Sequence, residues 1–100
     1  MTAYLVLMQE IDGVDGYRNG YLSGIRAFLE KHGGEVLVAS FGAQPAEGDP
    51  PNSTVVIRFA TTEAAWGFLD DPDYQPLREI RMNTTSRNQM VIAPEFVPPS

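Results

Sequence analysis

The chain has 100 residues, of which 43% are hydrophobic and 20% are charged, a balance that predicts one globular domain and argues against a disordered chain. Its net charge is −6, and its seven lysines and arginines form no basic run, which argues against partners that are nucleic acids or anionic membranes. The chain contains no cysteine, which excludes disulfides, thiolate catalysis and thiolate metal sites.

Residues 3–10 are a compact apolar run of β-forming residues, bounded by Ile11-Asp12-Gly13. This run predicts a strand that is buried on both faces. It has no basic leader and no cleavage site, and no apolar stretch approaches the length of a membrane span. We therefore expect a cytoplasmic protein without a signal peptide or a membrane segment.

Residues 14–32 have the three- and four-residue spacing of an amphipathic helix, which a glycine pair at 33–34 ends. Gly16, Gly20 and Gly24 recur inside it, although each interior glycine costs a helix about 1 kcal/mol relative to alanine. They form a smooth stripe beside the apolar face of the helix, where another backbone can come close. We expect the second helix, a partner chain or a loop to lie there; the alternative is a weak helix that moves to admit a ligand.

The rest of the chain alternates strands and helices. Residues 35–41 and 54–60 are predicted strands, joined by a loop rich in glycine and proline. A second helix is capped by Thr61 or Thr62 and runs to Asp70, and a short helix begins at Asp71-Pro72. Residues 87–93 form the last strand, so we expect one domain over residues 1–94 and a tail over 95–100.

This element order, β-α-β, loop, β-α-β, predicts an α+β ferredoxin-like fold with a four-stranded antiparallel sheet and its helices on one face. The strands are apolar on both faces, so the face without helices has to be covered. The simplest cover is the sheet of a second copy in a homodimer. The space between the two sheets is then either a filled core or a ligand cavity.

Three stretches carry a family resemblance: HGGEVLVASFGA at 32–43, TVVIRFATTEAAWGFLDDPDYQPLREIR at 54–81, and the last apolar strand. Over about residues 3–93 the chain resembles the bacterial family called domain of unknown function 1330. That family belongs to the dimeric α/β-barrel superfamily, whose members include cofactor-free monooxygenases, polyketide cyclases, muconolactone isomerases, haem proteins and small ligand-binding domains. The resemblance implies the fold and the dimer more than the chemistry. This chain departs from the family pattern at Ser40, usually arginine, and at Arg58, usually glutamate.

Arg58 is the leading functional candidate because it lies inside an otherwise apolar strand. Ile57 and Phe59 suit the helix-covered face, so we expect Arg58 to point into the space between sheets. A buried guanidinium needs an anionic or carbonyl partner, and its fork suits carboxylate or enolate oxygens. The alternative is a structural ion pair with Glu35, Glu10 or a carboxylate of the partner subunit.

His32 is the only histidine, and its residue type is the one that ordinarily changes charge near neutral pH. At the end of its helix it completes the apolar face and suits the helix dipole, with proton transfer to a substrate as the alternative role. No second histidine accompanies it, so we expect neither a metal ion nor a haem. Arg78 and Arg81, three residues apart on the short last helix, are expected to form a solvated face.

These residues favour a small-molecule-binding protein, and more specifically a cofactor-independent isomerase, cyclase or monooxygenase acting on a small organic or polyketide-like substrate. Arg58 would hold a developing oxyanion, and His32 or Tyr21 would move the proton. A non-catalytic ligand-binding or accessory subunit is the alternative, as is a purely structural dimer. We expect no cofactor, and the expected partners are a second copy and the small organic ligand. The expected ligand-binding residues are Tyr4, Met8, Tyr17, Phe41, Trp66, Tyr74 and Met90.

Overall fold

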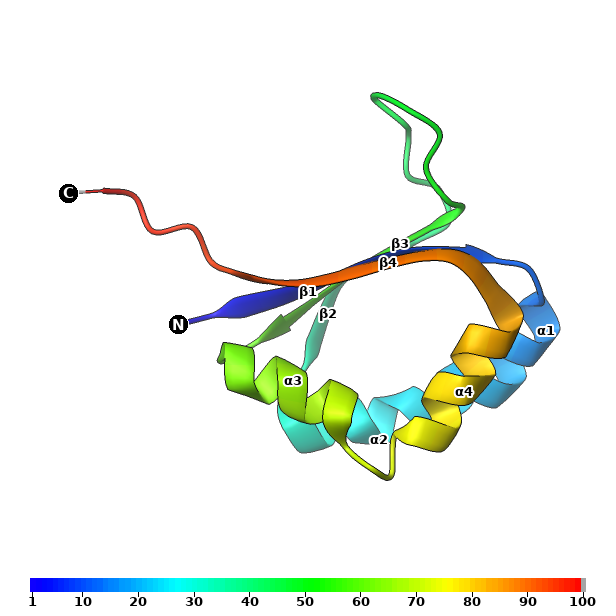
Figure 1. The fold of residues 1–100 in the computed structure, drawn as a ribbon, viewed down its shortest axis with the longest axis horizontal. Helices are drawn as coiled ribbons and strands as arrows, with labels where there is room; N and C mark the ends of the chain where they lie inside the picture. The colour runs from blue at the N-terminus through cyan, green and yellow to red at the C-terminus, as the bar shows by residue number, and fades with distance from the viewer. Residues whose placement is uncertain (100) are drawn as a thin grey trace.

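The computed structural model describes residues 1–99 and contains one four-stranded sheet with all of its helices on one side (Figure 1). The strand order is β2-β3-β1-β4 and every neighbouring pair is antiparallel, which confirms the predicted α+β ferredoxin-like fold. The sheet is open at both edges, so the barrel stays a prediction that needs a second copy. The elements are β1 (Ala3–Ile11), α1 (Val14–Gly16), η1 (Tyr17–Leu22), α2 (Ser23–His32), β2 (Glu35–Ser40), β3 (Ser53–Phe59), α3 (Thr62–Asp70), α4 (Gln75–Thr84) and β4 (Thr85–Pro94).

The first predicted helix spans residues 14–32 but changes its geometry on the way. Between α1 and α2, the segment η1 is a π-helix, a rare form that often occurs at functional sites. Tyr17 and Tyr21 are its buried residues, and their rings stack with centroids 5.3 Å apart. The helix ends at Gly33, whose φ of 72° lies in the left-handed region that glycine adopts without strain.

The glycine stripe lies against α4, the last helix of the chain, and not against the second predicted helix. A Cβ atom at Gly20 would stand 2.9 Å from Cγ2 of Ile80, and one at Gly24 would stand 3.0 Å from Cδ2 of Leu77. The stripe therefore allows η1 and α4 to approach more closely than a larger residue would permit.

Two elements begin two or more residues away from their predicted start. The last helix begins at Gln75 and not at Asp71, because the Asp71 side chain accepts a hydrogen bond of 3.0 Å from the backbone N–H of Asp73 and holds a turn there. The last strand begins at Thr85 and contains a register shift opposite β1, where Arg87 has a φ of 53°. The predicted cap of α3 is confirmed, since Thr61 Oγ1 accepts from the Ala64 N–H at 3.0 Å.

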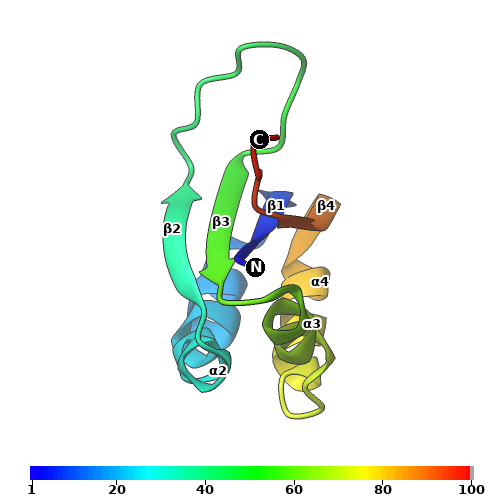
Figure 2. The ribbon, with the colours of Figure 1, turned by 90° about the vertical axis from the view of Figure 1, so that its left-hand side faces the viewer.

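The two faces of the sheet have different surroundings. Leu5, Ile57 and Phe59 point toward the helices and are almost fully buried. Among the described residues no helix lies on the opposite side, and the loop 41–52 rises from it (Figures 1 and 2). We call this side the open face; strand register and alternation place on it Tyr4, Val6, Met8, Glu35, Val38, Val56, Arg58 and Val91.

Candidate functional site

A cleft of about 100 Å³ lies between the helix-covered face of the sheet and the segments η1 and α2. Its lining is apolar except for three tyrosines, so we call it the tyrosine cleft; it is defined by Tyr17, Tyr21 and Tyr74 together with sheet residues that include Leu5, Ile57 and Met90. For comparison, an apolar cavity of roughly 150 Å³ holds one benzene molecule. The tyrosine cleft alone is smaller than that cavity, so a ligand of one ring would fill it and extend beyond it.

A second cavity of about 170 Å³ adjoins the tyrosine cleft. Tyr17, Leu22, Ala39 and Val55 line both cavities. The second cavity extends to Phe41, where β2 passes into the loop 41–52. A bound molecule thus has room to extend from the three tyrosines toward this loop.

The tyrosine hydroxyls of the cleft are hydrogen-bonded to neutral groups. Oη of Tyr21 and Oη of Tyr74 are 2.7 Å apart, and Gln9 Nε2 donates to Oη of Tyr17 at 3.1 Å. Burial raises the pKa of the Tyr17 hydroxyl, and burial together with the neighbouring Tyr74 raises the pKa of Tyr21 still further. Tyr17 and Tyr21 therefore remain protonated and act as neutral hydrogen-bond donors at physiological pH.

Arg81 stands behind this group of hydroxyls. Its side chain comes from α4, the residue is only 3% exposed, and Nη1 donates to Gln9 Oε1 and to Asn88 Oδ1, both at 3.1 Å. Gln9 thus joins Arg81 to Tyr17. Within residues 1–99 no carboxylate forms an ion pair with Arg81, and its buried Nε has no hydrogen-bond partner.

The burial of Arg81 makes the prediction of a solvated face on α4 wrong for this residue. Leu77 precedes Arg81 by one helical turn and packs against the hydrophobic core, so Arg81 is carried toward the sheet with it. The register shift between β1 and β4 brings Asn88 to meet the guanidinium. The sequence signal was the spacing of Arg81 from Leu77 and Ile80, which places the arginine on the apolar side of the helix.

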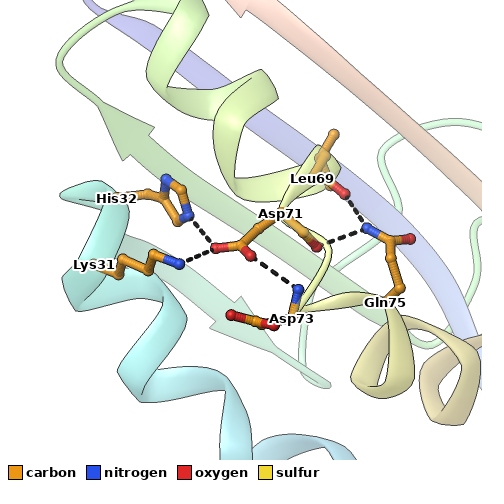
Figure 3. A network of polar contacts seen from close by, with 6 residues as sticks. All are labelled: Lys31, His32, Leu69, Asp71, Asp73 and Gln75. Carbon is orange, nitrogen blue, oxygen red and sulfur yellow. Dashed lines mark hydrogen bonds and ion pairs between the residues drawn. The ribbon is translucent and has the colours of Figure 1, made fainter.

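Asp71 forms a second polar cluster at the end of α2 (Figure 3). Its Oδ2 lies 2.8 Å from both Lys31 Nζ and His32 Nε2, and its Oδ1 accepts from the Asp73 N–H. The Lys31 ammonium, followed by His32 and the Asp73 N–H, holds the pKa of the Asp71 carboxyl far below its usual value. We call Lys31, His32 and Asp71 the Asp71 latch, because they tie α2 to the turn between α3 and α4.

The Asp71 latch is separate from the tyrosine cleft. Gln75 reinforces it by donating from Nε2 to the carbonyls of Leu69 and Asp71, at 2.8 and 3.0 Å (Figure 3). The His32 ring meets Phe68 edge-on at 6.2 Å and does not line the cleft, whereas Phe68 does. The latch therefore supports the packing around the cleft without reaching into it.

The structure brings together some of the residues that the sequence selected. Tyr17, Tyr21, Tyr74 and Met90 line the tyrosine cleft, while Phe41 lines only the adjoining cavity. These side chains come from η1, the α3–α4 turn, β4 and the β2–β3 loop, which no spacing in the sequence relates to one another. The predicted grouping of these five residues in a binding site stays a prediction.

Other selected residues lie elsewhere. Arg58 lies on the open face, half exposed, where it forms an ion pair with Glu35. Tyr4 and Met8 lie on that same face, and Trp66 is 51% exposed on α3. The structure does not bring together the three residues predicted to act in catalysis. Arg58 lies on the open face, His32 in the Asp71 latch and Tyr21 in the tyrosine cleft.

Within residues 1–99, no three His, Cys, Asp or Glu side chains gather in a way that could hold a metal ion. In the same range, none of the helices combines the length and the apolar character needed to cross a bilayer.

The sequence matches a family model over nearly its whole length. The model is that of a domain of unknown function (DUF1330), and it covers residues 2–95. The chain belongs to this family. No curated protein matches the sequence of this DUF1330 domain.

Solved structures resemble this DUF1330 domain in fold. A protein of unknown function from Rhodopseudomonas palustris has a TM-score of 0.72 and 12% identity, over 97% of this chain and 84% of its own. A hypothetical protein from Arabidopsis thaliana has a TM-score of 0.67 and 12% identity, over 98% and 91%. A NIPSNAP-like domain protein from Burkholderia xenovorans has a TM-score of 0.59 and 15% identity, over 98% and 89%. At these identities the likeness concerns the fold alone.

Proposed function

We propose that this DUF1330 domain binds a small, largely apolar organic molecule in the tyrosine cleft. The observation that carries the proposal is an apolar cleft of about 100 Å³ in which three tyrosines are the only polar side chains among the described residues. Binding sites for small molecules are typically concave and apolar, with a few polar groups that orient the ligand. The size of the cleft favours a single ring or a short branched chain over a polyketide-sized molecule.

The same cleft is the place where cofactor-independent isomerase, cyclase or monooxygenase chemistry would occur. Its titratable side chains are the three tyrosines, and burial raises the pKa of Tyr17 and of Tyr21. Such hydroxyls orient a ligand oxygen well but are poor bases at neutral pH. The geometry therefore supports ligand binding better than proton abstraction by this chain.

We also propose that a second copy of the chain covers the open face. Val38 and Val91 are 40% and 58% exposed there, beside Val6 and Val56, which makes an apolar surface without a partner. The ion pair of Arg58 with Glu35 places both signs of charge side by side. A two-fold axis passing between these two side chains would bring Arg58 of each copy against Glu35 of the other, which makes the patch suitable for a symmetric contact.

Titration with toluene, followed by amide and methyl NMR, tests the binding proposal. We expect toluene to shift the signals of Tyr17, Tyr21 and Met90 and to leave those of Arg58 and Trp66 in place. Ala39→Trp, which fills the lining shared by the two cavities, should abolish these shifts, whereas Ala46→Trp in the exposed loop should not. A folded protein whose cleft signals do not respond to toluene overturns the proposal.

Native mass spectrometry of the protein purified gently from its own host examines both proposals at once. We expect a dimer that carries a small molecule, whose mass then identifies the ligand class. A clean monomer at micromolar concentration contradicts the second copy on the open face and leaves the toluene experiment to decide the binding proposal.

A further inference from the structure

The guanidinium of Arg81 is a positive charge buried without a negative partner among residues 1–99. Both of its hydrogen-bond acceptors, Gln9 Oε1 and Asn88 Oδ1, are neutral amide oxygens, and its Nε has no acceptor. A buried charge normally has an opposite charge beside it, because leaving water is otherwise costly. A positive charge without a counter-ion among residues 1–99 therefore lies next to the tyrosine cleft, linked to Tyr17 through Gln9.

Arg81 also determines how the Tyr17 hydroxyl is oriented. A guanidinium can only donate, so the group of Gln9 that faces Arg81 must be the carbonyl oxygen Oε1. The amide Nε2 of Gln9 is then directed to Oη of Tyr17 and donates to it. Because Oη accepts this bond, the proton of Tyr17 is free to be donated in another direction, and the ring of Tyr17 lines the cleft.

The pair formed by Tyr21 and Tyr74 offers a second donor. Two hydroxyls at 2.7 Å share one hydrogen bond, in which one O–H donates and the other oxygen accepts. The O–H of the accepting tyrosine has no acceptor among residues 1–99. The side-chain polar groups that line the cleft therefore present hydrogen-bond donors to a ligand, and no carboxylate is among them.

We infer that the ligand of the tyrosine cleft is a small organic carboxylate, whose oxygens accept from Tyr17 and from the Tyr21–Tyr74 pair while Arg81 supplies the balancing positive charge. This inference rests on the proposed function and names the ligand class of the same site. The apolar lining holds the body of the ligand. Arg81 is a positioning residue, because it acts on the ligand through Gln9 and Tyr17 and through its charge.

Three probes of similar size separate the contributions to binding. Toluene tests the apolar cleft, benzamide adds a neutral carbonyl acceptor, and benzoate adds a negative charge to the same shape at pH 7.5. We expect benzoate to bind about tenfold more tightly than benzamide, since hydrogen bonds to charged groups are stronger than those between neutral ones. Dissociation constants from NMR or calorimetry provide the ratio.

Variants then assign the preference to particular residues. Tyr17→Phe should lower the affinity for benzoate about tenfold and leave that for toluene unchanged, while Tyr4→Phe on the open face should change neither. Arg81→Gln keeps an amide donor but removes the charge, so the ratio of benzoate to benzamide affinity should fall toward one. If Arg81 only supported the fold, Arg81→Gln would lower the affinities for benzoate and for benzamide by the same factor, and their ratio would stay unchanged.

The outcomes distinguish this inference from the proposed function. If toluene binds but benzoate is no tighter than benzamide, the inference is overturned and the apolar binding site stands. If none of the three probes binds to the folded domain, the proposed function fails as well. If Arg81→Gln does not give the NMR spectrum of a folded domain, the Tyr17→Phe and Tyr4→Phe comparison decides.

Discussion

Arg58 and Arg81 lie on opposite sides of one sheet and have opposite environments. Arg58 comes from the centre of an apolar strand, yet it is half exposed on the open face and pairs with Glu35. Arg81 comes from a helix with charged neighbours, yet it is only 3% exposed and is hydrogen-bonded to neutral amides. The comparison shows that the sequence neighbours of a charge do not determine its burial. Burial depends instead on which layer of the fold packs over the charged residue.

The largest expected effect comes from introducing a lysine at two adjacent residues of β1 that point to opposite faces of the sheet. Leu5→Lys places a charge in the core, where it lacks a partner and costs more than about 3 kcal/mol, so we expect an unfolded chain. Val6→Lys places the same charge on the open face and should yield a folded monomer. Circular dichroism reports folding and light scattering reports the mass. Unfolding of both variants would contradict the proposed difference between the faces.

Arg81→Met should have the next largest effect. It leaves Gln9 Oε1 buried without a donor and leaves Asn88 Oδ1 with the Thr85 hydroxyl, at 3.2 Å, in place of the charged donor. We expect the free energy of unfolding to fall by about 2 kcal/mol. The expected fall is no larger because the variant also removes a buried charge without a counter-ion among residues 1–99, and that change by itself favours the folded state. Urea denaturation in the Val6→Lys background excludes any contribution from a dimer. An unchanged or increased stability would mean that the buried charge costs more than its hydrogen bonds contribute.

Asp71→Asn should mainly change how stability depends on pH. The pKa of Asp71 in the folded chain is lowered from its usual 3.8, so its contribution is fully present above that pH and is lost as the pH falls below it. Stability of the parent chain should therefore decline below pH 4, and the decline should be shallower in Asp71→Asn. Asp70→Asn removes a neighbouring exposed charge outside the latch and should keep the parent profile.

Arg58→Met should have the smallest effect. Both side chains of its ion pair are about half exposed, and such pairs contribute less than about 1 kcal/mol to stability. Measured in the Val6→Lys background, the loss should be well below that of Arg81→Met. A loss of unfolding free energy as large as that of Arg81→Met would contradict the proposed difference between the two arginines.

Much of the fold follows from local patterns in the sequence. The alternation of side chains in the strands indicates which residues share a face, and the glycine pair at 33–34 marks the end of the first helix. The π-helical geometry of η1 has no such signal, because the spacing of Tyr17 and Tyr21 fits an ordinary α-helix equally well. The start of α4 was misplaced since the turn at Asp71 depends on side-chain hydrogen bonds.

The candidate site was predictable in part. The tyrosines at 17 and 21 could be chosen because they share a helix face and carry hydroxyls that need partners when buried. Their partners could not be chosen, since Gln9 is eight residues from Tyr17 and Tyr74 is 53 residues from Tyr21. Arg81 meets Gln9 across 72 residues.

By itself, the sequence determined the order of elements, the two faces of each strand and the absence of thiolate chemistry, because these depend on composition and on periods of two to four residues. The tertiary structure alone decided which groups the buried Arg81 meets and which hydroxyls converge on one cleft. The physical reason is that burial and hydrogen bonding across long sequence separations depend on how the layers pack, and no local period encodes that packing.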